Sequence, residues 1–349
     1  MIDGTTKGLF RMKRLLPLVF LALLASCGGT PNEDPYVVKW ATPTGAPTLA
    51  FYPEAENENW FSSATPATQV LPHFGDNAYD ALVFDGTQAL TNIKVNKRNY
   101  ALAKWISGGT FYVVSTKYQA TDTAPENPKV MAFMKQGNIS KAFRDLAKNK
   151  WGWGEYPADT SDAVFYGDAV SAVQGQLASM LSAGSVADDP YDYYLVADPV
   201  YSAMMAQFKK ANLPLYSVYD MQSEFKALHA GADIPAAAIF VNKDSYAAHP
   251  AAIDSWLAGV QANINVVASN LDPVIEEVKK SDSEDGKSNA RFGISSAALT
   301  VVKKRAGTDQ NPMNYHASAE GWAKEQNLAY ANSFQTALGE SAFEEAYFL

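Results

Sequence analysis

The sequence predicts an α/β protein built from two domains. A nearly continuous apolar run, Tyr193 to Ala197, is typical of a strand covered on both faces, and Asp198-Pro199 directly after it can start a helix. The same order of strand, small-residue turn and helix recurs between Tyr79 and Ile93. The chain has 349 residues, which is longer than a chain that folds around a single hydrophobic core usually is, so we expect two domains.

The first 27 residues have the pattern of a lipoprotein signal peptide. Lys13 and Arg14 precede an apolar run, Leu15 to Ala25, that is too short to span a bilayer. The run ends in Leu24-Ala25-Ser26-Cys27, which resembles a bacterial lipobox in which Cys27 would carry the lipid and become the first mature residue. An ordinary secretory signal is the alternative, but Cys27 is the only cysteine in the chain.

We therefore expect residues 1–26 to be removed, with either Met1 or Met12 as the start, and residues 27–35 to form a tether. The lipid, including palmitate, would hold the protein in the bacterial cell envelope, on the outer side of the cytoplasmic membrane or in the periplasm. Removing residues 1–26 takes away four basic residues and one acidic residue, which changes the net charge from −9 to −12. An acidic body without a basic run argues against nucleic acid as a partner.

Sequence motifs for catalysis or metal binding are missing. The chain contains no phosphate-binding loop, no dinucleotide-binding turn, no nucleophile elbow and no HExxH motif, and its four histidines lack ligand spacing. One cysteine excludes a disulfide framework and a cysteine-based metal site. The sequence therefore favours binding over catalysis and predicts no catalytic residue, metal or cofactor.

Strands and helices follow one another along the remainder of the chain. Short apolar and β-branched runs predict strands at 36–41, 79–85, 100–104, 110–115, 129–134, 162–166, 193–197, 215–218 and 234–242. Apolar stripes and capping signals predict helices at 48–52, at 88–93, from a Ser140 cap onward, at 168–181, after Asp198, at 247–269 and over 317–348. Residues 281–288 are charged and predict an exposed insertion.

Three segments together resemble a known family. Asp80 to Ser115, Asp192 to Met205 and Ile234 to Ser269 are similar, in order and spacing, to the solute-binding lipoproteins of ABC importers. The nearest branch is the nitrate, sulfonate, taurine and thiamine-pyrimidine-precursor group. The resemblance implies a two-lobed periplasmic-binding-protein-like fold of type 2, with two crossover hinge strands and a ligand cleft between the lobes.

Carried onto this chain, the resemblance places the two lobes and their hinges. Lobe 1 would comprise residues 36–115 and 219–349, and lobe 2 would comprise residues 116–218. The hinges would lie near Thr116-Lys117 and Leu215 to Val218. In open α/β sheets, ligands bind at the carboxyl ends of the strands, where helix N-termini meet.

The resemblance also implies candidate ligand contacts in both lobes. They are Thr44, Gly45, Ala46, Thr87, Trp105 and Ser107 from lobe 1, and Gly137, Asn138, Ser140 and Asp198 from lobe 2. Asp198 stands where the family commonly has Glu before Pro, so it could reach the ligand, cap its helix or do both. Trp105 fits the core and the cleft equally well. Trp151 and Trp153 lie in a Gly-rich loop and could line the cleft.

The predicted function is capture of a small molecule outside the cell and its delivery to an ABC permease and ATPase, by a monomer. The ligand stays open among oxyanions, sulfonates, pyrimidines and similar molecules. Helix N-termini favour an anionic or polar group, whereas the tryptophans suit a flat ring. One alternative is an enzyme of the same fold that acts in thiamine-pyrimidine synthesis. Another is a surface lipoprotein that binds a macromolecule.

Overall fold

The computed structural model describes residues 36–54, 60–61, 67–133, 137–156, 164–167, 170–283, 292–307, 311–318 and 321–349. Contacts divide the chain into residues 1–36 and residues 37–349, and all the elements named below belong to the second unit. The predicted signal peptide, Cys27 and the whole predicted tether lie outside the described residues. No described helix is both long enough and apolar enough to cross a membrane.

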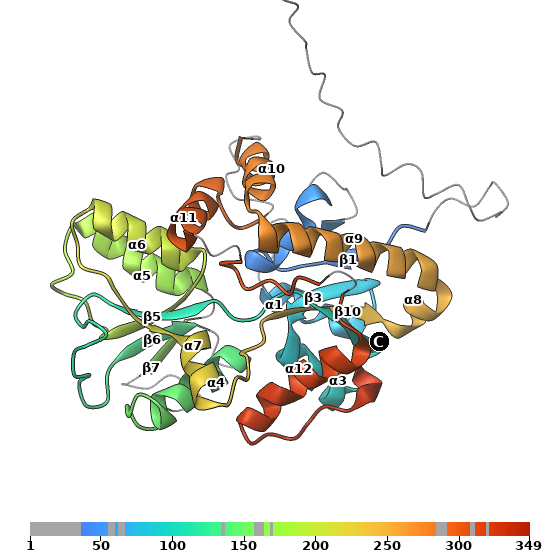
Figure 1. Ribbon diagram of the computed structural model, residues 1–349, viewed down its shortest axis with the longest axis horizontal. Coiled ribbons are helices and arrows are strands. Elements are labelled where there is room, and N and C mark those ends of the chain that lie inside the picture. The colour runs from blue at the N-terminus through green and yellow to red at the C-terminus, as the bar shows by residue number, and fades with distance from the viewer. Residues whose placement is uncertain are drawn as a thin grey trace, which may run out of the picture. The chain divides into compact units, whose positions relative to one another are not determined.

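The first sheet combines early and late parts of the chain, as predicted. Its strand order is β2-β1-β3-β10-β4. Figure 1 labels three of its neighbouring strands, β1, β3 and β10. These strands are β1 (Trp40–Ala41), β2 (Trp60–Phe61), β3 (Ala81–Asp85), β4 (Tyr100–Trp105) and β10 (Ala237–Asn242). β1, β2 and β3 are parallel, while β10 runs antiparallel to β3 and β4.

The second sheet is formed by strands from the middle of the chain. Its strand order is β7-β6-β8-β5-β9. These strands are β5 (Phe111–Ser115), β6 (Val130–Phe133), β7 (Val164–Gly167), β8 (Tyr193–Ala197) and β9 (Tyr216–Asp220). In β8, every residue but the last, Ala197, is buried, in agreement with the apolar run that predicted this strand.

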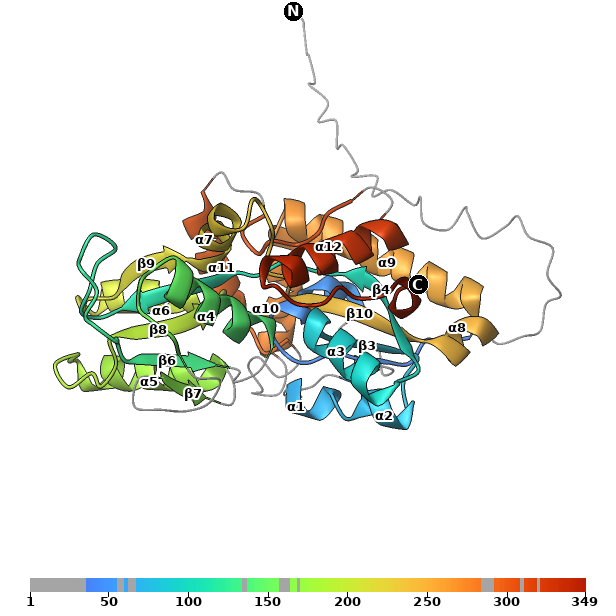
Figure 2. The same ribbon diagram turned by 90° about the horizontal axis from the view of Figure 1, so that it is seen from below.

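Helices cover both faces of each sheet and create separate cores. The bounds are η1 (Ala46–Glu54), α1 (Ala67–Val70), α2 (His73–Asp76), α3 (Gly86–Asn96), α4 (Asn138–Asn149), α5 (Val170–Ala183), α6 (Val200–Lys210), α7 (Met221–Leu228), α8 (Lys243–Ala248), α9 (Pro250–Ser269), α10 (Asp272–Ser283), α11 (Ser296–Ala306), α12 (Lys324–Ala337) and η2 (Glu345–Tyr347). Apolar residues of α9, α10 and α11 cover one face of the first sheet, and those of α2, α3 and α12 cover the other. Figure 2 shows α1, α2 and α3 gathered beside β3.

The two lobes are defined by their sheets, and their boundaries differ from the predicted ones. The first lobe contains residues 37–105 and 237–349, the second contains residues 111–228, and residues 106–110 and 229–236 cross between them. The hinges expected near Thr116-Lys117 and Leu215 to Val218 are therefore wrong. β5 pairs with β8 and β9, so the chain has already crossed when this strand begins.

Two predicted helices also differ from the structure. The helix expected over 247–269 begins as the separate α8 and is interrupted at His249, because Pro250 opens the new helix α9. In the region expected to be helical over 317–348, the described residues form α12 and the short η2 and otherwise no helix. Gly339 adopts φ 68° shortly after α12 ends, a conformation that glycine tolerates best.

Candidate functional site

Asp85 and Asn138 form a direct hydrogen bond between the lobes. Asp85 ends β3 and caps α3, because its Oδ1 accepts the N–H of Gln88 at 2.8 Å. Asn138 is the first residue of α4, and its Nδ2 lies 3.2 Å from the same Oδ1 atom. The N-terminus of one helix in each lobe therefore meets the same carboxylate.

The surroundings of Asp85 affect its charge. Burial raises the pKa of Asp85 to about 7, although the backbone N–H groups of Gln88 and Thr87 and the positive charge of Lys141 act in the opposite direction. Lys141, also on α4, forms an ion pair with Glu340 of the first lobe at 2.6 Å. The charge of Lys141 is thus largely compensated by a residue other than Asp85.

A second contact between the lobes joins Asp198 and Arg305. Asp198 follows β8, and its Oδ1 accepts hydrogen bonds from the backbone N and the Oγ of Ser202, at 3.1 and 2.6 Å. Its Oδ2 accepts the Nη2–H of Arg305, which comes from the last turn of α11 in the first lobe. Burial raises the pKa of Asp198, while Arg305 and Ser202 oppose that rise.

Two tyrosines of the second lobe complete the environment of Arg305. The rings of Tyr112 and Tyr201 stack with their centres 3.9 Å apart. The guanidinium carbon of Arg305 lies 5.4 Å from the centre of the first ring and 5.2 Å from that of the second. These distances allow cation–π attraction in addition to the ion pair.

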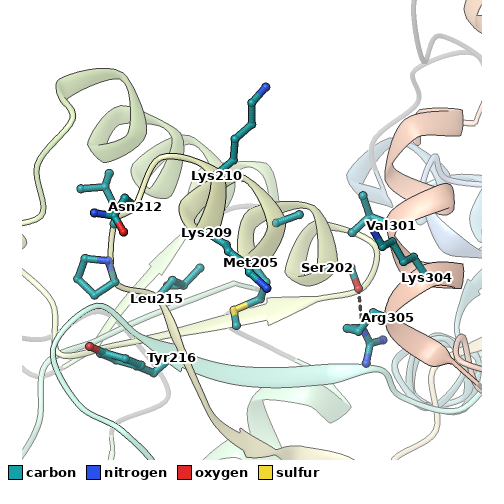
Figure 3. A pocket seen from close by; sticks show the side chains of 13 residues that line it. Ser202, Met205, Lys209, Lys210, Asn212, Leu215, Tyr216, Val301, Lys304 and Arg305 are labelled. Atoms are coloured by element: carbon teal, nitrogen blue, oxygen red, sulfur yellow. Dashed lines mark hydrogen bonds between the residues drawn. The ribbon is translucent and has the colours of Figure 1, made fainter.

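A groove of about 1020 Å³ opens beside Arg305, between α6 and α11 (Figure 3). Its walls combine apolar side chains with the cations Lys209, Lys210, Lys304 and Arg305. None of the predicted ligand contacts lines this groove. The groove nevertheless adjoins the carboxyl end of β8, because Ser202 and Arg305, which both bond to Asp198, line it.

The structure brings some of the predicted contacts together at Asp85. Thr87 is buried in the first turn of α3, Gly137 precedes α4, and Asn138 reaches across to the first lobe. Ser140 lies inside the first turn of α4, so the prediction that it caps this helix is wrong; Gly137 occupies the cap position, with φ 112°. Asp198 lies at another helix start and is held by Arg305.

The remaining predicted contacts are engaged in the first lobe and at the first crossover. Gly45 donates its N–H to Phe292 O at 2.8 Å, and Ala46 O accepts the hydroxyl of Tyr315, so a later segment covers the turn from Thr44 to Ala46. Ser107 is buried in the first crossover, where it pairs with Tyr315.

Trp105 belongs to the core. It is fully buried against α3, and its Nε1–H donates to Asn327 O at 3.1 Å. Of the two interpretations left open by the sequence, the structure supports the core. Trp151 and Trp153 likewise stack on Tyr219 and Tyr193, at 4.6 and 4.4 Å, within the second lobe.

Asp85 and Arg305 are the residues that sequence reasoning missed. Asp85 ends a strand and precedes a small-residue turn, which is the pattern that singled out Asp198, so a signal existed. Arg305 ends a cationic helix, and nothing in the sequence indicates its partner 107 residues away. Within the described ranges, no three His, Cys, Asp or Glu side chains gather as a metal site requires.

Comparisons with known proteins identify the fold. No protein-family profile and no curated sequence matches the chain. Among solved structures, the ligand-binding component of an ABC-type import system from Staphylococcus aureus, with zinc bound, is similar at 7% identity and TM-score 0.58, covering 89% of this chain and 95% of that one. The alkanesulfonate-binding protein of Xanthomonas axonopodis pv. citri, bound to MOPS, is similar at 12% identity and TM-score 0.56, covering 91% and 99%.

A third similar structure names the fold directly. A Candida albicans protein described as having the generic periplasmic binding protein fold is similar at 9% identity and TM-score 0.53, covering 87% of this chain and 89% of that one. Two sheets of mixed direction, each with helices on both faces and joined by two crossovers, agree with this assignment. The predicted two-lobed periplasmic-binding-protein fold is confirmed.

Proposed function

We propose that this chain is an extracytoplasmic solute-binding protein that captures a small molecule between its lobes and delivers it to an ABC importer. The observation that carries this proposal is the hydrogen bond between Asp85 and Asn138, which joins helix N-termini of the two lobes. In α/β sheets, this is the edge where ligands bind. Similarity to the ligand-binding component of an import system supports the same function.

The contacts between the lobes suit opening and closing. Asp85–Asn138, Lys141–Glu340 and Asp198–Arg305 are polar, so water can replace them when the lobes separate. An apolar contact, Phe225 on Phe334 with ring centres 5.4 Å apart, lies just before the second crossover. A hinge of this kind needs only a few residues to change their backbone angles, and residues 106–110 and 229–236 supply them.

Location and partners form part of the same proposal. The lipobox at Leu24-Ala25-Ser26-Cys27 supports a lipid anchor on Cys27, with a monomeric body outside the cytoplasmic membrane. The importer would contribute a permease and an ATPase as partners. The protein itself would release its ligand chemically unchanged.

A ligand screen tests this function. The purified body, starting after Cys27, is screened by thermal shift against oxyanions, sulfonates, pyrimidines, flavins and amines, because a ligand that binds the folded state raises its melting temperature. A hit is then titrated by calorimetry into the parent and into Asn138→Ala. Loss of one hydrogen bond predicts affinity weakened by about threefold to tenfold.

The matched control is Asn149→Ala, at the other end of α4, where Asn149 bonds to Asp145 within the same lobe. This variant should bind like the parent. Equal affinities in all three proteins would place the site elsewhere. A chemically altered ligand, detected by mass spectrometry after release, would favour the enzyme of the same fold.

A further inference from the structure

The helix N-termini at the strand ends of this protein already hold carboxylates of the protein itself. The inference drawn from this rests on the proposed function, because it concerns which ligand the site between the lobes accepts. Asp85 accepts the Gln88 N–H at the start of α3, and Asp198 accepts the Ser202 N–H at the start of α6. Free N–H groups of this kind are what binds an anion at a helix start.

The start of α4 is directed at Asp85 as well. Gly137, at the cap position of this helix, has no side chain to cap it, and the first helical residue, Asn138, donates its amide to Asp85 Oδ1. Lys141 lies one turn along the same helix, and its positive charge acts to lower the pKa of Asp85. One carboxylate thus receives hydrogen bonds from the starting turns of two helices, one in each lobe.

The other donors in the region are also engaged within the protein. In the turn before η1, Gly45 donates its N–H to Phe292 O. Lys141 pairs with Glu340, and Arg305 pairs with Asp198. Lys141 and Arg305 thus each face a carboxylate across the lobes, whereas Asp85 has no ion pair with any described residue.

We propose that Asp85 is a specificity-determining residue: its carboxylate occupies the place where helix N-termini would hold an oxyanion, so the protein excludes small oxyanions such as sulfate and sulfonates. When Asp85 is ionised, an incoming oxyanion would meet a like charge and would find its hydrogen-bond donors already used. A ligand that donates hydrogen bonds to Asp85 has no such conflict. Selectivity then arises from repulsion of the wrong ligand as much as from attraction of the right one.

A gain-of-function substitution tests this proposal. In Asp85→Asn, the side chain remains a good helix cap but loses its charge and adds an amide donor. Methanesulfonate and sulfate are the probes, with sodium chloride at equal ionic strength as the reference. The measurement is the melting temperature against probe concentration at about pH 8.5, above the Asp85 pKa of about 7, so that the parent carries the charge.

The parent should show no stabilisation beyond the chloride reference. Asp85→Asn should bind methanesulfonate, with apparent affinity on the order of tenfold or more above that of the parent. The matched control is Asp220→Asn. Asp220 also caps a helix, but it is exposed, and the N–H groups that it accepts, from Gln222 and Ser223, belong to its own lobe. This variant should behave like the parent.

Each contrary result overturns the proposal. Binding of methanesulfonate or sulfate by the parent would show that Asp85 does not exclude oxyanions, while leaving the solute-binding function intact. Absence of a gain in Asp85→Asn, with folding verified by circular dichroism, would show that Asp85 is not the excluding group. An equal gain in Asp220→Asn would show that the gain comes from the change in net charge and not from the position of Asp85. Failure of the solute-binding function is seen separately, when no ligand class binds to the parent.

Discussion

Arg305 of α11 and Asp198 at the end of β8 form an ion pair between the two lobes. Both carboxylate oxygens of Asp198 are engaged, one by Ser202 and the other by Arg305. The Asp198 side chain is 0% exposed and that of Arg305 is 32% exposed. Asp198 therefore accepts the N–H of Ser202 in the first turn of α6 and also binds Arg305 of the other lobe.

Loss of Arg305 is expected to separate the lobes at this end. In Arg305→Gln, Asp198 keeps its bonds to Ser202 but loses its counter-charge from the other lobe. We expect a loss of about 1–3 kcal/mol in the free energy of unfolding, less than for a fully buried pair because Arg305 is partly exposed. Small-angle scattering should show a larger radius of gyration for the ligand-free variant than for the parent.

Lys304→Gln is the matched control for this change. Lys304 precedes Arg305 on α11 and lines the same groove, so its substitution removes the same charge from the same helix turn. It should leave the radius of gyration unchanged. A parent-like radius in Arg305→Gln, or an equal expansion in Lys304→Gln, would contradict a role for the Asp198–Arg305 pair in holding the lobes.

The raised pKa of Asp85 predicts a pH dependence of stability. The folded protein keeps a proton on Asp85 up to about pH 7, whereas the unfolded chain releases it near 3.8. Between these values the folded state binds more protons, so the stability contributed by this group falls as the pH rises from 3.8 to about 7 and is constant above that. In Asp85→Asn, this pH-dependent contribution to the free energy of unfolding is absent.

Denaturant titrations of both proteins across this pH range measure the effect. The free energy of unfolding of Asp85→Asn, minus that of the parent, should increase from pH 4 to 7 and then level off. His316 acts oppositely, because burial lowers its pKa to about 3, but both proteins contain it and its contribution cancels in the difference. A difference that is flat with pH would mean that Asp85 is ionised like an exposed carboxyl.

Local patterns predicted the strands well, while contacts between distant segments decided the lobes and the site. β8 was predicted at its observed bounds because a continuous apolar run between polar ends admits few alternatives. The lobe to which β5 belongs depends on β8 and β9, which lie about 80 and 100 residues later, and its own apolar residues fit either sheet. The short crossover at residues 106–110 therefore could not be located from the sequence.

The candidate site shows the same limit. Asn138 was proposed as a ligand contact from the family resemblance, and the structure shows that it bonds to Asp85 of the other lobe. What distinguishes Asp85 is its hydrogen bond to Asn138 of α4 in the other lobe, and the sequence around Asp85 does not indicate this contact. The partner of Arg305 is set by packing of α11 on α6, which no spacing in the sequence reveals.

Lipid anchoring is predicted from residues that the structure does not describe. Cys27→Ser removes the thiol that a lipobox requires, so the variant should be found in the soluble fraction or still carry its signal peptide. Membrane fractionation with mass measurement of the N-terminal peptide distinguishes these outcomes from the lipidated parent. A Ser variant that is processed and sediments with membranes would show that Leu24-Ala25-Ser26-Cys27 is not a lipobox.

The assignment of Trp105 to the core predicts a pair of contrasting glycine substitutions. A Cβ at Gly86 would overlap the Trp105 ring, whereas one at Gly175, exposed on α5, would meet nothing within 4 Å. Gly86→Ala should therefore lower the free energy of unfolding by about 1–3 kcal/mol through overpacking. Gly175→Ala should raise it by about 0.5–1 kcal/mol, because alanine loses less conformational freedom in a helix. Thermal or urea unfolding measures both. If Gly86→Ala were as stable as the parent, the Trp105 ring would have room to move and would again be a candidate for the ligand site.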